Sequence, residues 1–269
     1  MLYFGVIGHP IKHSASPIMH NTVFRTLGID AIYLSFDVKP EELRDAVYGA
    51  KALGFKGLNV TIPHKEEIIK FVKPVGLAEK IGTVNTVDVQ NLKGYNTDAI
   101  GALRTLETYG VDYEGKIVLI VGAGGVARAI AFALAGKSTL IITNRTASRG
   151  LKLAEDIRKF GDCIFYPYEK IKELKGKFDI LINCTPLGMK GFEEKLPVPA
   201  SLIENVVVFD TVYNPIETPL IKLAKRRGCK VVYGLDMLVY QGAEALKIWL
   251  DIEPPIDIMK KAVIEFLRL

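Results

Sequence analysis

The stretch KIVLIVGAGGVA, residues 116–127, joins an apolar run to a glycine-rich turn, and a helical pattern follows directly. A strand, the spacing GxGxxA and a helix in this order are typical of a dinucleotide-binding βαβ unit. Gly122 permits the tight turn, Gly124 lets the backbone approach a pyrophosphate, and Ala127 allows the helix to pack closely on the strand. The positive end of that helix attracts phosphates. The stretch therefore predicts a dinucleotide site, and a plain strand-to-helix turn is the alternative.

A second apolar run, residues 140–143, ends in the sequence NRTASR, residues 144–149. A site specific for NAD usually has Asp or Glu here, about 20 residues beyond the glycines, to bind the ribose 2′-hydroxyl. This chain instead has Arg145 and Arg149, with the short polar side chains of Asn144 and Thr146. Arginine matches a 2′-phosphate bidentately, whereas a carboxylate would repel it. The residues favour NADP(H), and the start of a solvated helix is the alternative.

Strand-like and helix-like segments alternate outward from this stretch in both directions. The strand candidates are residues 3–8, 31–38, 57–62, 83–89, 116–121, 140–143, 179–183, 206–210 and 230–233. Helical periodicity is found in residues 17–27, 40–53, 65–72, 98–109, 126–135, 147–160 and 219–227. This alternation predicts an α/β fold with mainly parallel sheets, and residues 83–95 are typical of a hairpin.

The domain organisation follows from an interruption at residues 110–115 and from the tail. Residues 236–269 contain no strand pattern, only two amphipathic helices separated by Glu253-Pro254-Pro255. We expect these helices to return to the first domain. The prediction is one α/β domain from residues 1–100 and 236–269, and a doubly wound Rossmann-type domain from residues 101–235.

Composition excludes several classes of protein. Of the 269 residues, 49% are apolar and 24% charged, which excludes disorder and coiled coil. No apolar run approaches the roughly 20 residues of a membrane span, and the N-terminus has no signal-peptide pattern, so we expect a cytoplasmic protein. The net charge, 35 − 30 = +5, is scattered and suits a small anionic ligand better than nucleic acid.

Metal binding and disulfides are not expected from the sequence. The three cysteines form no CxxC pair and fit small buried hydrophobes in a reducing compartment. His9 and His13 have HxxxH spacing, but Pro10 between them makes a shared helical face improbable.

Polar residues gather at strand ends and helix starts in the first hundred residues. Ser14 and Ser16 lie in a loop before a helix, where Ser16 also fits an N-cap. Asn59 and Thr61 share one face of a strand end, and Lys65 follows at the start of a helical pattern.

Asn85 and Asp98 repeat this placement, although Asp98 also fits an N-cap for a helix from Ala99. Strand ends and helix starts are where α/β folds form ligand crevices. Hydroxyl, carboxamide and carboxylate groups suit a polyhydroxylated ligand, and Lys65 suits a carbonyl or a proton transfer. Gln241 is a polar group on an otherwise apolar helical stripe, either a satisfied core amide or a ligand contact.

These residues stand in ordered blocks that cover the whole chain. The blocks are GHPIKHSASP (8–17), LNVTIPHK (58–65), IGTVNT (81–86), GYNTD (94–98), GAGGVA (122–127), NRT (144–146), NCTPLGM (183–189), DTVYNP (210–215) and GLDMLVYQG (234–242). In these blocks the chain closely resembles the shikimate dehydrogenases. The resemblance implies reversible, NADPH-linked reduction of 3-dehydroshikimate to shikimate, in the pathway to chorismate and aromatic amino acids.

The resemblance also implies roles for individual residues. Lys65 and Asp98 match the catalytic pair. The positions that match the substrate site are Ser14, Ser16, Asn59, Thr61, Lys65, Asn85, Asp98, Tyr213 and Gln241. Those that match the cofactor site are Gly122, Ala123, Gly124, Gly125, Val126, Ala127, Asn144, Arg145, Thr146, Arg149, Thr185, Val212 and Gly234. Thr83 and Val212 depart conservatively from the family pattern.

Several alternatives stay open at this point. Lys65 can donate the proton itself, or act as a charged group that orients the substrate while water relays the proton. A quinate/shikimate dehydrogenase that uses NAD is the nearest other enzyme, although Arg145 and Arg149 disfavour NAD. A methylenetetrahydrofolate dehydrogenase would not need this polar set, and Lys65 with Asp98 argues against a non-catalytic NADP sensor. The chain is a monomer or a homodimer.

Overall fold

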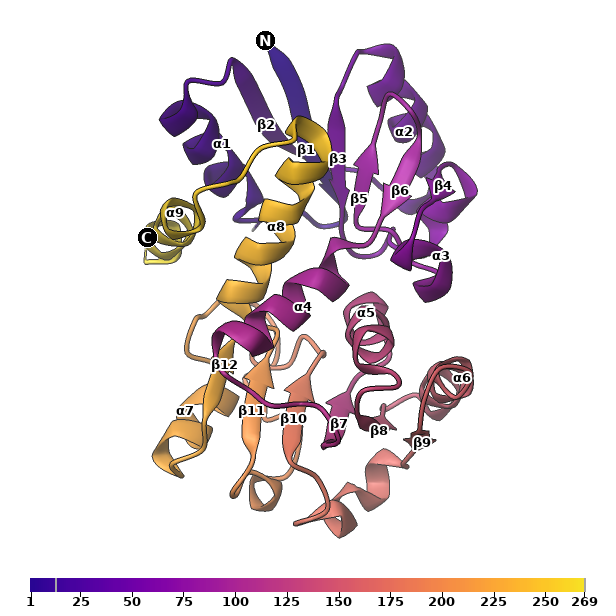
Figure 1. Ribbon diagram of the computed structural model, residues 1–269, viewed down its shortest axis with the longest axis vertical. Coiled ribbons are helices and arrows are strands. Elements are labelled where there is room, and N and C mark those ends of the chain that lie inside the picture. Colours follow the sequence, from indigo (N-terminus) through magenta and orange to yellow (C-terminus); the bar gives the residue numbers. More distant parts are fainter. Residues whose placement is uncertain (13, 269) are drawn as a thin grey trace. The chain divides into compact units, whose positions relative to one another are not determined.

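The computed structural model describes residues 1–12 and 14–268. Two units are distinguished in it: unit 1 contains Met1–Gly101 and Val239–Leu269, and unit 2 contains Ala102–Leu238 (Figure 1). The divisions fall inside the helices α4 (Thr97–Thr108) and α8 (Gly234–Leu250). Unit 1 is therefore built from both ends of the described chain, and unit 2 from one continuous segment.

Unit 1 is organised around a mixed sheet. Its strands are β1 (Leu2–Gly8), β2 (Ala31–Asp37), β3 (Gly57–Val60), β4 (Lys73–Pro74), β5 (Thr86–Asp88) and β6 (Lys93–Tyr95). They lie in the order β2-β1-β3-β5-β6-β4, with β1 parallel to β2 and β3. Apolar side chains such as Ile7, Leu58 and Val87 are almost fully buried in its core.

The predicted hairpin is confirmed by β5 and β6, which pair antiparallel, Thr86 opposite Tyr95. β3 also pairs antiparallel with β5, and Asn59 lies opposite Thr86. The end of β3, the start of β5 and the end of β6 therefore meet at one edge of the sheet. Asn59, Asn85 and Asp98 all lie at that edge.

The helices of unit 1 come from both parts of the chain. They are α1 (Ser16–Leu27), α2 (Leu43–Ala52), α3 (Leu77–Ile81), α9 (Ile256–Leu267), parts of α4 and α8, and the 3₁₀ helices η1 (Pro40–Glu42) and η2 (Glu67–Lys70). Trp249 of α8 packs over Gly57 and donates a hydrogen bond to the Val87 carbonyl at 3.0 Å. The predicted return of the C-terminal helices to the first unit is thus confirmed.

Unit 2 contains a parallel sheet. Its strands are β7 (Ile117–Val121), β8 (Thr139–Thr143), β9 (Cys163–Phe165), β10 (Ile180–Asn183), β11 (Val207–Asp210) and β12 (Val231–Tyr233). The order β12-β11-β10-β7-β8-β9 is that of a doubly wound dinucleotide fold, in which the connections change direction between β7 and β10. The predicted α/β class and the Rossmann-type sheet are confirmed. Ligands of such sheets bind at the carboxyl ends of the strands flanking this point.

The helices of unit 2 follow its strands along the chain. They are α5 (Gly125–Leu134), α6 (Ala147–Ile157), α7 (Pro219–Arg226), and the 3₁₀ helices η3 (Tyr168–Leu174) and η4 (Ala200–Leu202). Ile120, Ile130 and Ile182 lie fully buried in one core cluster, and Leu119 and Leu181 in another. Burial on both sides explains why these strands contain apolar runs without polar alternation.

Candidate active site

Lys65 and Asp98 form an ion pair in unit 1. Lys65 Nζ lies 2.5 Å from Asp98 Oδ2, and their side chains are only 11% and 7% exposed. Charged side chains are rarely buried to this degree unless they are paired. A lysine and a carboxylate held together at a sheet edge can orient a substrate hydroxyl and move a proton.

Lys65 does not begin a helix, so the predicted helix over residues 65–72 is wrong. Turns follow Pro63, and only Glu67–Lys70 form a 3₁₀ helix. Lys73 and Pro74 pair with β6 as β4, a strand that the sequence patterns did not predict. The pairing of β4 thus ends the segment at Val72, and no α-helix forms between Lys65 and β4. The Val84 N–H donates to the Lys65 carbonyl at 2.8 Å, which ties Lys65 to the chain just before Asn85.

Asp98 is not the N-cap of α4. The Asn96 side chain accepts from the Ala99 N–H at 3.2 Å, and Asp98 lies within the first turn. The Asp98 carboxylate therefore has no capping function and is available to Lys65. A carboxylate in the first turn is also favoured by the helix dipole.

Asn85 connects Asp98 to the surrounding polar groups. Its amide nitrogen donates to Asp98 Oδ1 at 2.9 Å and to Thr97 Oγ1 at 3.0 Å, while its oxygen accepts from the Thr97 N–H at 2.7 Å. Gln241 Oε1 lies 3.4 Å from the same nitrogen. Lys65, Asn85, Asp98 and Gln241 are thus brought together, as the sequence predicted for neighbouring site residues.

The Asn59 side chain makes hydrogen bonds within the protein through both its nitrogen and its oxygen. Its amide nitrogen donates to the Asn85 carbonyl at 3.2 Å and to Thr86 Oγ1 at 3.0 Å, and its oxygen accepts from the Tyr33 hydroxyl at 2.7 Å. Sequence reasoning missed Tyr33, Thr86 and Thr97. For Thr86 and Thr97 the signal was adjacency to Asn85 and Asp98; Tyr33 lies in a strand with no such signal.

Ser14, Ser16 and Thr61 lie on the loops and helix start of the same unit. Ser16 is not the N-cap of α1, because Ala15 occupies that position. The Ser14 hydroxyl accepts from the Ser16 N–H at 3.3 Å, so Ser14 has a local structural role. Thr61 directly follows β3, and its N–H donates to the Ile7 carbonyl at 2.9 Å.

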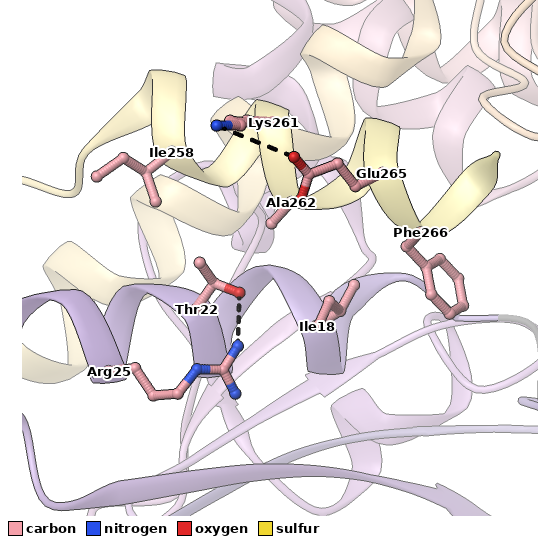
Figure 2. A pocket seen from close by; sticks show the side chains of 8 residues that line it. All are labelled: Ile18, Thr22, Arg25, Ile258, Lys261, Ala262, Glu265 and Phe266. Atoms are coloured by element: carbon pink, nitrogen blue, oxygen red, sulfur yellow. Dashed lines mark hydrogen bonds and ion pairs between the residues drawn. The ribbon is translucent and has the colours of Figure 1, made fainter. Parts of the chain in front are cut away.

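A separate groove of about 590 Å³ lies between α1 and α9 (Figure 2). Ile18, Ile258 and Phe266 line it, with Arg25 and Lys261 among its polar groups. None of the predicted site residues is among the described residues that line it. We therefore do not associate this groove with the chemistry.

In unit 2, the glycine loop fits a pyrophosphate. Gly122 has φ +116°, and a Cβ there would lie 3.0 Å from the Cys184 carbonyl oxygen. A Cβ on Gly124 would meet no heavy atom of the described chain within 4 Å. Gly124 is also the N-cap of α5, and within the described residues neither a side-chain cap nor an acidic first-turn residue occupies that helix end. The loop therefore offers N–H groups to an anion. Ala123, Gly125, Val126 and Ala127 complete this turn.

The segment after β8 fits a 2′-phosphate. Arg145 and Arg149 are exposed, and the Asn144 amide donates to the Thr146 carbonyl at 2.8 Å, which shapes the turn before α6. The residues from Asn144 to Arg149 include no carboxylate. Two guanidinium groups in a segment whose own sequence contains no carboxylate favour NADP over NAD.

A buried polar network underlies the remaining predicted cofactor residues. Asp210, at the end of β11, accepts from Asn183 at 2.9 Å, from the Val212 N–H at 3.1 Å and from Thr218 at 2.6 Å. Asn183 in turn accepts from the Thr185 hydroxyl at 2.7 Å. The network therefore holds Thr185 and Val212. Asp210 was not among the predicted site residues, and the signal that could have found it was an acid at the end of a predicted strand.

Tyr213 and Gly234 lie beside this network in unit 2. Tyr213 directly follows Val212 in the segment after β11, and Gly234 is the first residue of α8. A Cβ on Gly234 would overlap the Thr211 and Asp210 backbone, so the position excludes any side chain.

Burial raises the pKa of Asp210 from 3.8 to about 6, although Thr218, Val212 and Asn183 act in the opposite direction. The folded protein therefore binds a proton more tightly than the unfolded chain between these values, and stability falls as pH rises from about 4 to about 6. We expect Asp210→Asn to remove this loss. The unfolding free energy of the variant minus that of wild type should therefore rise by about 3 kcal/mol from pH 4 to pH 7, measured by urea unfolding at each pH.

The matched control for this prediction is Asp112→Asn, the same change at a carboxylate that is 74% exposed in unit 2. Its stability should keep the wild-type pH dependence. Parallel pH curves for wild type and Asp210→Asn would contradict the prediction.

The described residues contain no group of three or more His, Cys, Asp or Glu that could hold a metal ion. His9 pairs with Asp37 at 2.6 Å, and His13 lies outside the described residues. Among the residues that the structure describes, no helix is long and apolar enough to cross a membrane.

Comparisons with known proteins match the chain along most of its length. A family model described as the shikimate dehydrogenase substrate binding domain matches residues 6–87. A model described as shikimate / quinate 5-dehydrogenase matches residues 104–192, and one described as the shikimate 5′-dehydrogenase C-terminal domain matches residues 234–264.

Individual relatives are similar over their full length. The shikimate dehydrogenase (NADP(+)) of Archaeoglobus fulgidus is 56% identical over 270 residues, 100% of both chains. A crystal structure of a shikimate dehydrogenase in complex with NADP+ has a TM-score of 0.94 at 44% identity, covering 99% of this chain and 96% of the other. The Thermus thermophilus enzyme in complex with NADP(H) and shikimate has a TM-score of 0.87 at 36% identity, covering 98% and 99%.

A doubly wound sheet with a dinucleotide loop, together with a second α/β unit that holds a buried lysine–carboxylate pair, defines a nicotinamide-dependent oxidoreductase. The identities and coverage then establish the particular family. The chain belongs to the shikimate dehydrogenase family and is an NADP-dependent oxidoreductase.

Proposed function

We propose that this enzyme catalyses the reversible reduction of 3-dehydroshikimate to shikimate with NADPH, in the pathway to chorismate and aromatic amino acids. Unit 1 is the substrate domain and unit 2 the NADP domain. The observation on which the proposal mainly rests is the nearly buried ion pair of Lys65 with Asp98, 2.5 Å apart, among neutral hydrogen-bonding side chains.

The substrate is a ring with a carboxylate and several hydroxyls. In unit 1, hydroxyl and carboxamide groups for it are supplied by Ser14, Ser16, Asn59, Thr61, Asn85 and Gln241. Tyr213 is a further proposed substrate residue, with a phenol group. Of these, Asn85 donates hydrogen bonds to both Gln241 and Asp98, so Asn85 and Gln241 support the reacting end of the substrate. Asn59 has both amide hydrogens engaged within the protein, so it contacts the substrate through its oxygen or acts by holding Asn85.

NADPH, when bound, supplies the hydride that reduces the carbonyl carbon. Lys65 as an ammonium stabilises the negative charge that develops on the carbonyl oxygen, and gives that oxygen a proton directly or through a water molecule. Asp98 holds Lys65 and can accept a hydrogen bond from the reacting hydroxyl. In the reverse direction the same proton returns to Lys65.

The cofactor residues in unit 2 divide by the part of NADP they serve. Gly122–Ala127 receive the pyrophosphate. Asn144, Arg145, Thr146 and Arg149 receive the 2′-phosphate and its ribose. Thr185, Val212 and Gly234 line the nicotinamide side, held by the network around Asp210.

The test is a set of initial rates of nicotinamide reduction, with shikimate and quinate each combined with NADP and NAD. We expect turnover with shikimate and NADP, and a kcat/KM at least 100-fold lower when NAD replaces NADP, because NAD lacks the 2′-phosphate and losing a bidentate charged contact costs several kcal/mol. Comparable rates with quinate or NAD would place the enzyme in the broader quinate/shikimate class. Dinucleotide binding without turnover would overturn the proposal and favour an NADP sensor.

A further inference from the structure

Tyr33 is a buried tyrosine at the edge of the proposed substrate site, and its ring is fixed independently of its hydroxyl. It is 0% exposed, and its ring stacks on His20 with centroids 4.4 Å apart and planes 17° apart. The Asn21 side chain of α1 binds both the N–H and the carbonyl of Tyr33 at 2.8 Å. Removing the hydroxyl alone would therefore leave the ring in place.

A continuous series of hydrogen bonds leads from Tyr33 to the catalytic pair. The Tyr33 hydroxyl donates to Asn59 Oδ1 at 2.7 Å, and Asn59 Nδ2 donates to Thr86 Oγ1 at 3.0 Å. Thr86 Oγ1 donates to Asn85 Oδ1 at 3.2 Å, and Asn85 Nδ2 donates to Asp98 Oδ1 at 2.9 Å. Asp98 binds Lys65 through its other oxygen.

The orientation of the Asn59 amide in this series is determined on its nitrogen side by the Asn85 carbonyl and Thr86, and on its oxygen side by the Tyr33 hydroxyl. A flipped Asn59 would turn its oxygen toward the Asn85 carbonyl, two acceptors that repel each other, and would leave Thr86 without its present donor. The Tyr33 hydroxyl is also a partner of Ser16. That contact lowers the pKa of Tyr33, while burial, the larger effect, raises it well above its usual value, so the hydroxyl keeps its proton.

We propose that Tyr33 is a positioning residue for the reaction: its hydroxyl orients the Asn59 amide and, through Thr86 and Asn85, the carboxylate of Asp98. The inference rests on the proposed function, because it assigns Tyr33 to the Lys65–Asp98 pair. Tyr33 lies on the strand β2 and is not one of the proposed substrate-binding or catalytic residues.

The first test is Tyr33→Phe, which removes one hydroxyl and keeps the ring. The expected result is a kcat for shikimate about 10-fold lower, from the lost buried hydrogen bond, with the KM for NADP unchanged. Tyr48→Phe, the same change at a 42% exposed tyrosine of unit 1, is the control and should match wild type. An unchanged kcat in Tyr33→Phe, or a raised KM for NADP, would overturn the inference.

The second test separates positioning from a general structural role. Thr86→Val removes the next hydroxyl in the series and should also lower kcat about 10-fold; it tests the series independently if Tyr33→Phe does not fold. If both act through Asn85, the double variant should remain about 10-fold below wild type rather than about 100-fold. A loss near 100-fold would mean independent effects and would reject the inference.

A measurement without turnover distinguishes failure of this inference from failure of the proposed function. In asparagine-labelled protein, the side-chain NH₂ resonances of Asn59 and Asn85 should shift in Tyr33→Phe and stay in place in Tyr48→Phe. If wild type turns over neither substrate, the proposed function fails, and these resonances alone decide the role of Tyr33. Unmoved resonances reject it.

Discussion

Lys65→Ala is expected to lower kcat for shikimate about 1,000-fold while changing the KM for shikimate less than about 10-fold. In the proposed reaction, the variant loses the group that stabilises charge on the carbonyl oxygen and moves its proton, and these interactions strengthen only as the reaction proceeds. The substrate contacts that we propose for Asn85 and Gln241 do not require the ammonium. Steady-state rates with saturating NADP would measure both constants.

Lys70→Ala is the matched control for this prediction, because Lys70 follows in the same segment but its side chain is 66% exposed and forms a surface ion pair with Glu67. It should retain wild-type kinetics. A Lys65→Ala variant whose KM rises steeply while kcat is kept would show that Lys65 only binds substrate, and would remove it from the catalytic pair.

Gly57→Ala is expected to destabilise the protein by about 3 kcal/mol and to lower Tm by about 10 °C. A Cβ at this position in β3 would overlap the indole ring of Trp249, and the ring cannot move away without breaking its hydrogen bond to the Val87 carbonyl. The substitution therefore separates α8 from the sheet. Calorimetry and urea unfolding would measure the loss.

Gly49→Ala supplies the control of opposite sign. Gly49 lies inside α2, and a Cβ there would meet no heavy atom of the described chain within 4 Å. Alanine is favoured over glycine in a helix interior by about 1 kcal/mol, so this variant should be at least as stable as wild type. Equal stability of the two alanine variants would contradict the packing of Trp249 on Gly57.

The fold of unit 2 was readable from the sequence because its signals are local. Residues 116–127 contain strand, turn and helix in one stretch, and the strands beside them are uniformly apolar because helices cover both faces. The strand β9 (Cys163–Phe165), a three-residue strand at one edge of the sheet, was not predicted.

The candidate site in unit 1 was only partly readable. Lys65, Asn85 and Asp98 were predicted because each lies beside a strand end or helix start, and the structure brings them together. Tyr33 was missed because its partner Asn59 is 26 residues away, and a tyrosine in a strand is normally explained by packing alone. The helix expected after Lys65 failed because the pairing of β4 with β6, a contact between distant residues, overrides local propensity.

The division of unit 1 between Met1–Gly101 and Val239–Leu269 has a consequence for how the chain folds as it is made. A ribosome releases all of Ala102–Leu238 before Trp249 and Gln241 emerge. Unit 2 can therefore fold during synthesis. The face of the sheet around Phe4 and Gly57 stays uncovered until Trp249, whose indole ring packs on it, has been made. Until α8 has been made, the nascent protein exposes an apolar surface and lacks Gln241 beside Asn85, so the same helix covers that surface and completes the polar cluster around Asn85.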